Sequence, residues 1–301
     1  MSRIFVCSQC AVHLSDMCVI LNIRVMNGKY ISTLTIAGSD SCGGAGIQAD
    51  IKTMSALGCY ASSVVTAVTA QDTCRVGSVM DVPAEIVGEQ LHMVLNDIRP
   101  QAVKTGMMSN ADIVGAVAGE LRAYGRVPLV VDPVMVATSG DALMRRGTLD
   151  VLISDLLPLA TLVTPNIPEA AALTGLTLQT DDDLWVAARR ILSFGCRAVL
   201  IKGGHQGSQE KTDRLLTADG CQAVFRSQTV DTRNTHGTGC TLSSAITAYI
   251  ARGSELRDAV ALAKEYLTDA LEAGKAVRVG DGHGAVDHFF NPERLIIHYN
   301  N

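Results

Sequence analysis

Short apolar runs alternate with amphipathic stretches from Thr33 onward, and this alternation restricts the fold more than any other feature of the sequence. The runs are apolar on nearly every residue, which is typical of parallel strands that helices cover on both faces. They occupy residues 33–37, 63–69, 102–104, 129–132, 161–164 and 198–201. The repeated strand–helix units predict a three-layer α/β fold with a mainly parallel central sheet and helices on both of its faces.

The stretches between the runs carry their apolar residues on one helical face. In two of these stretches the residues are Ile47, Ile51, Met54 and Leu57, and then Ile113, Val117 and Leu121. Residues 214–217 and 222–225 flank an Asp219-Gly220 step, which favours a hairpin turn. The parallel sheet should therefore gain an antiparallel edge.

No Pro- or Ser-rich linker and no internal repeat divides the 301 residues, so we expect one domain over residues 30–290. Residues 1–29 are predicted to be an N-terminal extension without structure, and residues 291–301 a C-terminal tail. The extension lacks the apolar run and the small-residue site of a secretory signal, and Met26 is the expected effective start. Its Cys7-x-x-Cys10 pair lacks the second ligand pair that a zinc site needs.

The formal charge of the chain is -5, and no block of Lys and Arg occurs in it. This argues against nucleic acid or an anionic membrane as a partner and favours a small molecule. No apolar run reaches the roughly 20 residues of a membrane-spanning helix. The nine cysteines are scattered over a long chain with 48% hydrophobic residues, which is unlike a small disulfide-stabilised fold. We expect reduced thiols and a cytoplasmic protein.

Polar residues follow each predicted strand. The segments are Gly38-Ser-Asp40, Gln71-Asp72, Lys104-Thr-Gly106, Asp132-Pro133, Pro165-Asn166 and Lys202-Gly-Gly-His205. Loops are polar in most proteins, so each segment alone says little. Because ligands of open α/β sheets collect at the carboxyl ends of the strands, the six segments together predict a ligand-binding cleft.

A glycine-rich turn after the first strand contains Gly44-x-Gly46-x-x-Ala49, which matches a dinucleotide-binding fingerprint. Asp72 stands near the position of a ribose-binding acid, so an NAD-dependent oxidoreductase is one hypothesis. The fingerprint should follow its strand at once, whereas five residues separate Gly38 from Gly44. The alternative is a turn that brings backbone close to a small ligand, with Asp50 one helical turn further along.

A second glycine-rich turn, Asn234-Thr-His-Gly-Thr-Gly-Cys240, runs into an apolar helical pattern. The N–H groups of Gly237, Thr238, Gly239 and Cys240 should converge at the helix N-terminus, where the dipole adds positive potential. This arrangement predicts a site for an anion such as a transferring phosphoryl group. The alternative is an ordinary capped helix whose glycines serve packing. The same field is expected to lower the pKa of the Cys240 thiol.

A phosphoryl-transfer enzyme also needs magnesium ligands and a cation near the phosphates. Asp132 at a strand end and Glu169 are candidate oxygen ligands for Mg²⁺, and Lys202 is a candidate to reach a donor phosphate. The alternative for Lys202 is a solvated loop cation. The segment Asn166-Ile-Pro-Glu169 also predicts a helix start in which Asn166 caps and Glu169 closes a capping box, and both interpretations of Glu169 are compatible.

Four separated segments, in this order, resemble one family. They are residues 34–50, Thr164-Pro-Asn-x-Pro-Glu-Ala170, Lys202-Gly-Gly-His205 and Asn234-Thr-His-Gly-Thr-Gly-Cys240. Together they resemble the hydroxymethylpyrimidine/phosphomethylpyrimidine kinases of thiamine biosynthesis, in the ribokinase-like superfamily, over about residues 30–290. The resemblance implies a ribokinase-like fold, ATP and Mg²⁺ as cofactors and a homodimer. It also implies successive phosphorylation of 4-amino-5-hydroxymethyl-2-methylpyrimidine and of its monophosphate.

The resemblance further implies roles for single residues. Gln71 matches the residue that binds the aminopyrimidine edge, where an amide can both donate and accept. Other walls of the pyrimidine pocket match Gly38, Asp50, Met107, Thr69 and Val134. Nucleotide-binding positions match Asn166, Lys202 and Thr235. Cys240 stands where related sugar kinases have an aspartate base, and it acts either as a base or as a positioning group beside the glycine-turn amides.

Three alternatives stay open from the sequence. A pyridoxal kinase of the same fold differs only in a short list of wall residues. An NAD-dependent oxidoreductase would bind its cofactor at residues 44–49. A non-catalytic pyrimidine sensor would keep Gln71 and Asp50 without the phosphate machinery, and the presence of Asp132, Glu169 and Lys202 argues against it.

Overall fold

The computed structural model describes residues 28–299 except 138–139, 141–142 and 204–208. The predictions for Cys7, Cys10 and Met26, and for most of the N-terminal extension, lie outside the described residues, as does His205. None of the helices in the described part of the chain is long and apolar enough to cross a membrane.

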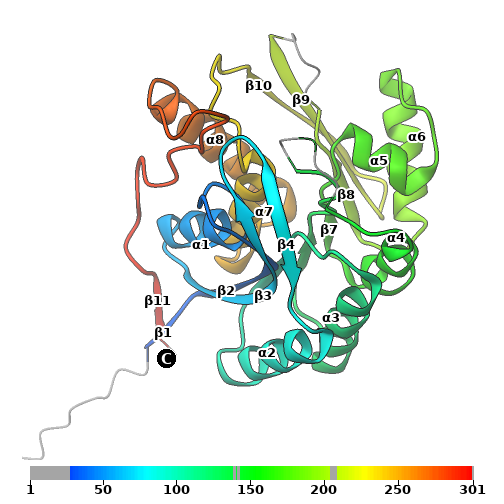
Figure 1. The fold of residues 1–301 in the computed structure, drawn as a ribbon. Coiled ribbons are helices and arrows are strands. Elements are labelled where there is room, and N and C mark those ends of the chain that lie inside the picture. Colours follow the sequence, from blue (N-terminus) through cyan, green and yellow to red (C-terminus); the bar gives the residue numbers. More distant parts are fainter. Residues whose placement is uncertain (1–27, 138–139, 141–142, 204–208, 300–301) are drawn as a thin grey trace, which may run out of the picture.

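A nine-stranded sheet forms the centre of the molecule, in the order β10-β9-β8-β7-β6-β5-β2-β3-β4 (Figure 1). The six predicted strands are its parallel part: β2 (Ser32–Asp40), β3 (Tyr60–Gln71), β5 (Ala102–Thr105), β6 (Leu129–Val131), β7 (Leu162–Val163) and β8 (Ala198–Ile201). The predicted hairpin is present as β9 (Glu210–Thr217) and β10 (Gln222–Gln228), and β9 runs antiparallel to β8.

One edge strand was not predicted. It is β4 (Val76–Asp81), which pairs antiparallel with β3 at the other edge of the sheet. All six of its residues are at least partly exposed. It therefore has no continuous apolar run, which is the signal that identified the other strands.

Helices cover both faces of the sheet and confirm the three-layer fold (Figure 1). On one face lie α1 (Gly46–Ala56), α7 (Thr238–Ala251) and α8 (Leu256–Gly274). On the other lie α2 (Ala84–Asp97), α3 (Ala111–Tyr124), α5 (Ile167–Thr174) and α6 (Asp181–Leu192), with the short α4 (Thr148–Val151), η1 (Leu152–Leu156) and η2 (Leu157–Leu159). The predicted apolar face of α3 is buried, and that of α1 is buried except for Ile51, which is partly exposed.

Side-chain alternation along the central strands decides which residues reach the layer of α1 and α7. In β5, Val103 packs into the apolar cluster of α2 and α3, so Lys104 points to the opposite face. In β2, Ile36 joins the same cluster as Val103, whereas the Thr35 hydroxyl donates a hydrogen bond to Asp50 of α1. Polar side chains are therefore buried beneath α1 and α7, close to the carboxyl ends of the strands.

The two ends of the described chain pair with each other. β1 (Gly28–Tyr30) and β11 (Ile297–Tyr299) form an antiparallel ribbon. The N–H groups of Glu293 and Ile296 donate to the carbonyl oxygens of Ala56 and Gly58. The division of the chain at residues 30 and 290 stays a prediction, but residues 293–299 lie against the domain.

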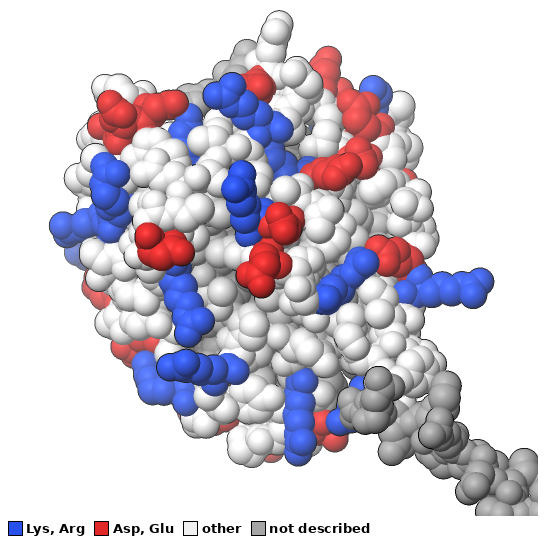
Figure 2. Space-filling model, turned by 180° about the vertical axis from the view of Figure 1, so that it is seen from behind, with Lys and Arg blue, Asp and Glu red and all other residues white. Residues whose placement is uncertain are grey.

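Charged side chains are mixed on the face of the molecule that Figure 2 shows. Lys and Arg are interspersed with Asp and Glu, and much of that face is uncharged. No continuous basic surface is visible on it.

Candidate active site

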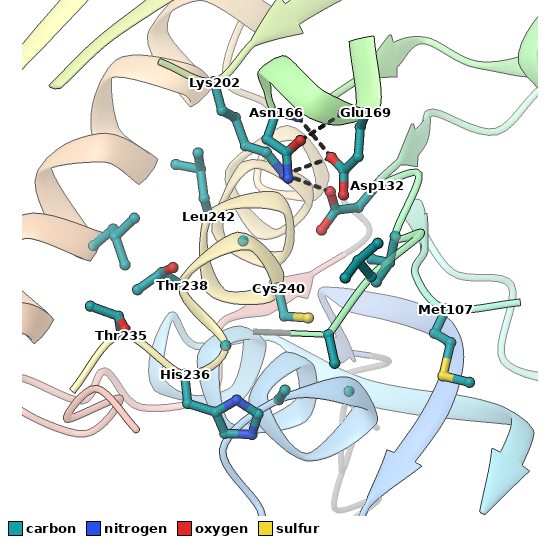
Figure 3. A pocket seen from close by; sticks show the side chains of 18 of the residues that line it. Met107, Asp132, Asn166, Glu169, Lys202, Thr235, His236, Thr238, Cys240 and Leu242 are labelled. Carbon is teal, nitrogen blue, oxygen red and sulfur yellow. Dashed lines mark hydrogen bonds and ion pairs between the residues drawn. The ribbon is translucent and has the colours of Figure 1, made fainter. Parts of the chain in front are cut away.

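A cleft with a volume of about 820 Å³ opens at the carboxyl ends of the parallel strands. All predicted site residues but one line it, namely Gly38, Thr69, Gln71, Met107, Asp132, Val134, Asn166, Glu169, Lys202, Thr235, Gly237, Thr238, Gly239 and Cys240. Figure 3 shows Lys202, Asn166, Glu169 and Asp132 together, with Cys240 between this group and His236. The remaining predicted residue, Asp50, does not line the cleft.

The N-terminus of α7 forms the middle of the cleft. Gly237 precedes the helix with a φ of 79°, and a Cβ atom there would lie 1.9 Å from the Gly44 carbonyl oxygen, so only glycine fits. Within the described residues, the N–H groups of Gly237, Gly239 and Cys240 donate to no acceptor. Because α7 is 14 residues long, its dipole adds positive potential at these groups, as expected for an anion site.

A buried ion pair faces this helix end. Lys202 Nζ lies 2.8 Å from Asp132 Oδ1 and 4.0 Å from Glu169 Oε2. A Cβ atom on Gly239 would lie 3.4 Å from Lys202 Nζ and 3.7 Å from Asp132 Oδ2, so the glycine keeps the helix end open toward this pair. Burial alone would raise the pKa of Asp132, but the nearby ammonium groups of Lys202 and Lys104 hold that pKa below its ordinary value.

Glu169 closes the predicted capping box at the start of α5. Its Oε2 accepts a hydrogen bond from the Asn166 N–H at 2.7 Å, and Asn166 Oδ1 accepts one from the Glu169 N–H at 2.8 Å. Burial raises the pKa of Glu169, a rise that Lys202 opposes and Asp132 adds to. Two carboxylates at the cleft wall that share one lysine are a donor set that suits a hydrated divalent cation.

The expectation for the Cys240 thiol is wrong. Its pKa is raised to about 11 because burial disfavours the thiolate, and the carboxylates of Asp50 and Asp132 add to the rise. Lys104 and a backbone hydrogen bond from Gly46 act in the opposite direction but do not overcome it. A helix end lowers a thiol pKa only where desolvation does not outweigh the dipole, and the sequence does not show that desolvation.

The opposite end of the cleft is formed by β2 and β3. The backbone of Gln71 is fixed by Ser41, whose hydroxyl donates to the Gln71 carbonyl at 2.7 Å and accepts from its N–H at 2.8 Å. The Thr69 hydroxyl donates to the Ser39 carbonyl. A Cβ atom on Gly38 would lie 3.0 Å from Met107 Sδ, so glycine gives the methionine room at the cleft wall.

Asp50 is buried in an ion pair beneath the cleft and does not form part of its wall. Its two carboxylate oxygens lie 2.9 and 2.8 Å from Lys104 Nζ, and both side chains have no exposed surface. The hydroxyls of Thr35 and Ser244 also donate to Asp50, each at 2.6 Å. Asp50 therefore has no exposed surface with which to contact the substrate directly, although the resemblance implied that it forms a wall of the substrate pocket.

The first glycine-rich turn does not have the geometry of a dinucleotide site. The N–H groups of Gly44 and Ala45, which would bind the pyrophosphate of a cofactor, donate to Asp40 Oδ2 at 3.0 and 2.8 Å. The Asp72 carboxylate accepts hydrogen bonds from the N–H groups of Cys74 and Arg75 in its own turn. The hypothesis of an NAD-dependent oxidoreductase is therefore wrong.

Sequence reasoning assigned no role to two side chains that join the glycine-rich turns, Asp40 and His236. His236 Nε2 lies 2.9 Å from Asp40 Oδ2 and 3.5 Å from Gln71 Nε2. Burial would raise the pKa of Asp40, but hydrogen bonds from His236, Ala45 and Cys42 hold that pKa well below its ordinary value. An acid at a strand end and a histidine beside a glycine turn were visible in the sequence, but only the fold brings them together.

The chain is similar to known proteins over most of its length. A family model described as phosphomethylpyrimidine kinase matches residues 40–287. A hydroxymethylpyrimidine/phosphomethylpyrimidine kinase of Rhizobium meliloti is 51% identical over 257 residues, which are 85% of this chain and 96% of that protein. A thiamine biosynthesis bifunctional protein of Geobacter sulfurreducens is 48% identical over 262 residues, which are 87% of this chain and 53% of that protein.

A solved structure agrees with these matches. The pyridoxal kinase from Staphylococcus aureus, in complex with AMP-PCP and pyridoxal, has a TM-score of 0.78 and 34% identity, and the match covers 87% of this chain and 94% of that chain. The ribokinase-like fold and the resemblance drawn from the four segments are confirmed.

Proposed function

The chain belongs to the phosphomethylpyrimidine kinase family, and we propose that it phosphorylates 4-amino-5-hydroxymethyl-2-methylpyrimidine and then the resulting monophosphate, with ATP as donor, in thiamine biosynthesis. The observation that carries this proposal is the position of the α7 N-terminus. Its first N–H groups, which have no acceptor in the described part of the chain, lie in the cleft between the Gln71 end and the Lys202–Asp132 pair. Such a site stabilises charge that develops on a phosphoryl group in transit.

The Gln71 end of the cleft suits the pyrimidine. An amide can accept a hydrogen bond from an exocyclic amine and donate one to the adjacent ring nitrogen. Gly38, Thr69, Met107 and Val134 complete the walls of this end. The hydroxymethyl group of a ring bound there would point toward the N-terminus of α7.

The Lys202 end suits the nucleotide. Lys202 and the N–H groups of α7 supply positive charge for the phosphates, and Asn166 and Thr235 also line the cleft. Val230, Leu267 and Leu271 also line the cleft and offer apolar surface for a purine ring. Asp132 and Glu169 would hold Mg²⁺, partly through water, and the ion when bound neutralises charge on the phosphate chain.

In the first reaction the hydroxymethyl oxygen forms a bond to the γ-phosphorus of ATP. The bond from that phosphorus to the bridging oxygen breaks, and ADP leaves. The hydroxyl proton passes to a base, for which Cys240 at the first turn of α7 is the candidate. The second reaction differs because its acceptor is a phosphate oxygen that is already anionic, so it needs no base.

The proposal includes a cytoplasmic homodimer. All six cysteines in the described residues are free thiols, as expected in a reducing compartment. At the edge of the sheet, Val68 of β3 pairs in register with Met80 of β4, and the two side chains are 45% and 65% exposed. Exposed apolar neighbours of this kind favour a contact between copies of the chain.

A coupled assay of ADP release tests the function. With ATP and Mg²⁺, we expect turnover with hydroxymethylpyrimidine and with its monophosphate. Pyridoxal is the second candidate substrate because the fold matches a pyridoxal kinase at a TM-score of 0.78. Turnover with pyridoxal alone would overturn the pyrimidine assignment, and turnover with none of the three substrates would overturn the kinase assignment.

A further inference from the structure

His236 is a side chain of the cleft to which the proposed reaction assigns no role. It directly precedes Gly237 at the N-terminus of α7, is almost fully buried and lines the cleft. Its Nε2 lies 2.9 Å from Asp40 Oδ2 and 3.5 Å from the nitrogen of the Gln71 amide. The imidazole therefore contacts both a buried carboxylate and the amide that is proposed to pair with the pyrimidine.

Asp40 decides which nitrogen of the imidazole carries a proton. Its Oδ1 accepts a hydrogen bond from the Cys42 N–H at 2.9 Å, and its Oδ2 accepts from the N–H groups of Gly44 and Ala45 at 3.0 and 2.8 Å. Three backbone donors favour the ionised carboxylate, which can only accept hydrogen bonds. At 2.9 Å from Oδ2, His236 Nε2 must therefore be a donor, and a protonated ring nitrogen cannot accept a hydrogen bond from Gln71.

Thr69 faces the other end of the Gln71 amide and needs a donor there. Its one hydroxyl proton goes to the Ser39 carbonyl at 3.0 Å, so Thr69 Oγ1, at 3.3 Å from the oxygen of the Gln71 amide, is left to accept. The two ends of an amide have almost the same shape, and their hydrogen bonds decide which end is the oxygen. In this structure the nitrogen lies on the His236 side, where it meets a second donor. A half-turn of the amide gives both neighbours a complementary partner.

The proposed substrate requires the same orientation of the amide. Its amino group lies on the ring carbon next to the one that carries the hydroxymethyl group, and the ring nitrogen lies on the far side of the amino group. Because the hydroxymethyl group must reach the N-terminus of α7, the amino group faces the His236 side of the cleft. The amide oxygen then accepts from His236 and from the amine, and the amide nitrogen donates to Thr69 and to the ring nitrogen. This arrangement uses both lone pairs and both protons of the amide.

We propose that His236 is a positioning residue that determines specificity: its Nε2–H, directed by Asp40, holds the oxygen of the Gln71 amide on the α7 side, so that the cleft accepts a 4-aminopyrimidine and rejects a 4-oxopyrimidine. This inference rests on the proposed function. In the 4-oxo compound the exocyclic group is an acceptor and the adjacent ring nitrogen carries a proton. Each would face a like group of the amide, and an amide that is held at both ends does not turn to suit them.

Calorimetric binding of hydroxymethylpyrimidine and of its 4-oxo analogue to the free protein tests this inference without ATP. The wild type should prefer the amino compound by about 100-fold or more, because the mismatch leaves two buried polar groups unpaired. His236→Phe keeps a flat ring but removes the N–H donor, so the amide can turn and the preference should fall about tenfold. The side chain of His236→Gln can donate to both Asp40 and Gln71, so this variant should keep most of the preference.

His92→Phe is the matched control, because His92 of α2 is exposed, and it should leave the preference unchanged. A purely structural role of His236 would weaken the binding of both compounds by the same factor, and their ratio would stay as in the wild type. If His236→Phe does not fold, Thr69→Val releases the other end of the amide and should lower the preference in the same way.

An unchanged preference in His236→Phe, or in Thr69→Val where that variant replaces it, would overturn the inference. Equal losses of preference in His236→Phe and His236→Gln would also overturn it, because the N–H donor would then make no difference. Neither result touches the proposed function, since the wild type would still bind and phosphorylate the amino compound. A wild type that binds neither compound would overturn the proposed function, and this inference with it.

Discussion

Some residues of this cleft are placed to contact a ligand, and others hold those residues in position. Gln71, Asp40 and His236 all line the cleft, and His236 contacts both of the others, at 2.9 Å from Asp40 Oδ2 and 3.5 Å from Gln71 Nε2. Gln71 could be identified from the sequence because it directly follows a predicted strand and because the resemblance implies a role for it. The sequence did not identify His236, since the contact to Asp40 joins residues 196 positions apart and exists only in the folded sheet.

Gln71→Ala should raise KM for hydroxymethylpyrimidine and leave KM for ATP unchanged. The substitution removes the amide that pairs with the donor and acceptor edge of the ring, and an unpaired buried polar group costs about 1–3 kcal/mol. Steady-state kinetics with each substrate varied in turn measures both constants. A rise in KM for ATP alone would show that Gln71 does not lie at the pyrimidine.

Asp40→Asn should lower the free energy of unfolding by more at pH 7 than at pH 3. The pKa of Asp40 is lowered in the folded protein, so its ionised form contributes stability that is present above the unfolded value of about 3.9 and is lost as the pH falls below it. At pH 3 the difference from wild type should be about 1 kcal/mol smaller.

Urea unfolding at the two pH values measures this difference. Asp97→Asn, at an exposed carboxylate, is the control and should show little effect at either pH. An equal loss at pH 7 and pH 3 would mean that the charge of Asp40 does not hold the two glycine-rich turns together.

Among the elements, the buried parallel strands were predictable and the exposed edges were not. β6 and β8 are apolar throughout, and all four residues of β5 are buried, because helices cover both faces of these strands. β4 and the β1–β11 ribbon are exposed, so they have no continuous apolar run that would mark them as strands. The partner of β1 also lies far away in the sequence, whereas β4 pairs with the strand just before it. The N-terminus of α7 was predictable because glycine positions and an apolar helical pattern both mark it.

Deletion of residues 291–301 should destabilise the domain, although the sequence suggests a separate tail. The deletion removes the hydrogen bonds of Glu293 and Ile296 to Ala56 and Gly58, and the salt bridge between Arg252 and Glu293 at 2.8 Å. At about 1 kcal/mol for each backbone hydrogen bond, the loss should reach about 2 kcal/mol. Thermal melts compare this variant with one that lacks only residues 300–301, and equal melting temperatures would contradict the packing.

For the molecule as a whole, the parallel sheet is what turns scattered motifs into one site. Because the carboxyl ends of β2, β3, β6, β7 and β8 meet at one edge, the residues after them line a single cleft. The sequence predicted that the residues after these strands line one cleft, but it did not show which side chains are buried beneath that cleft. Asp50 belongs to the matched segment, yet its burial beside Lys104 depends on how α1 packs on β5 and α7.

Deletion of residues 1–25 should leave turnover and the melting temperature unchanged. The predicted strand pattern and the glycine motifs begin only at Thr33, and the described fold begins at Gly28. Thermal melts and the coupled assay on the truncated protein are the measurements. A clear fall in melting temperature would show that the extension packs on the domain.

The central claim is that phosphoryl transfer takes place at the N-terminus of α7, and turnover of Gly239→Val tests it most directly. The Cβ atom would stand 3.4 Å from Lys202 Nζ, and the branched side chain would fill the opening where backbone N–H groups must close on the phosphoryl group. Gly239 is not the left-handed residue of this turn, so the variant keeps the backbone conformation that Gly237→Val would disturb. Turnover should fall by about 10²–10³-fold, while calorimetric binding of hydroxymethylpyrimidine at the Gln71 end stays nearly intact. Full turnover in Gly239→Val, with the protein folded, would contradict the account and place the transfer elsewhere in the molecule.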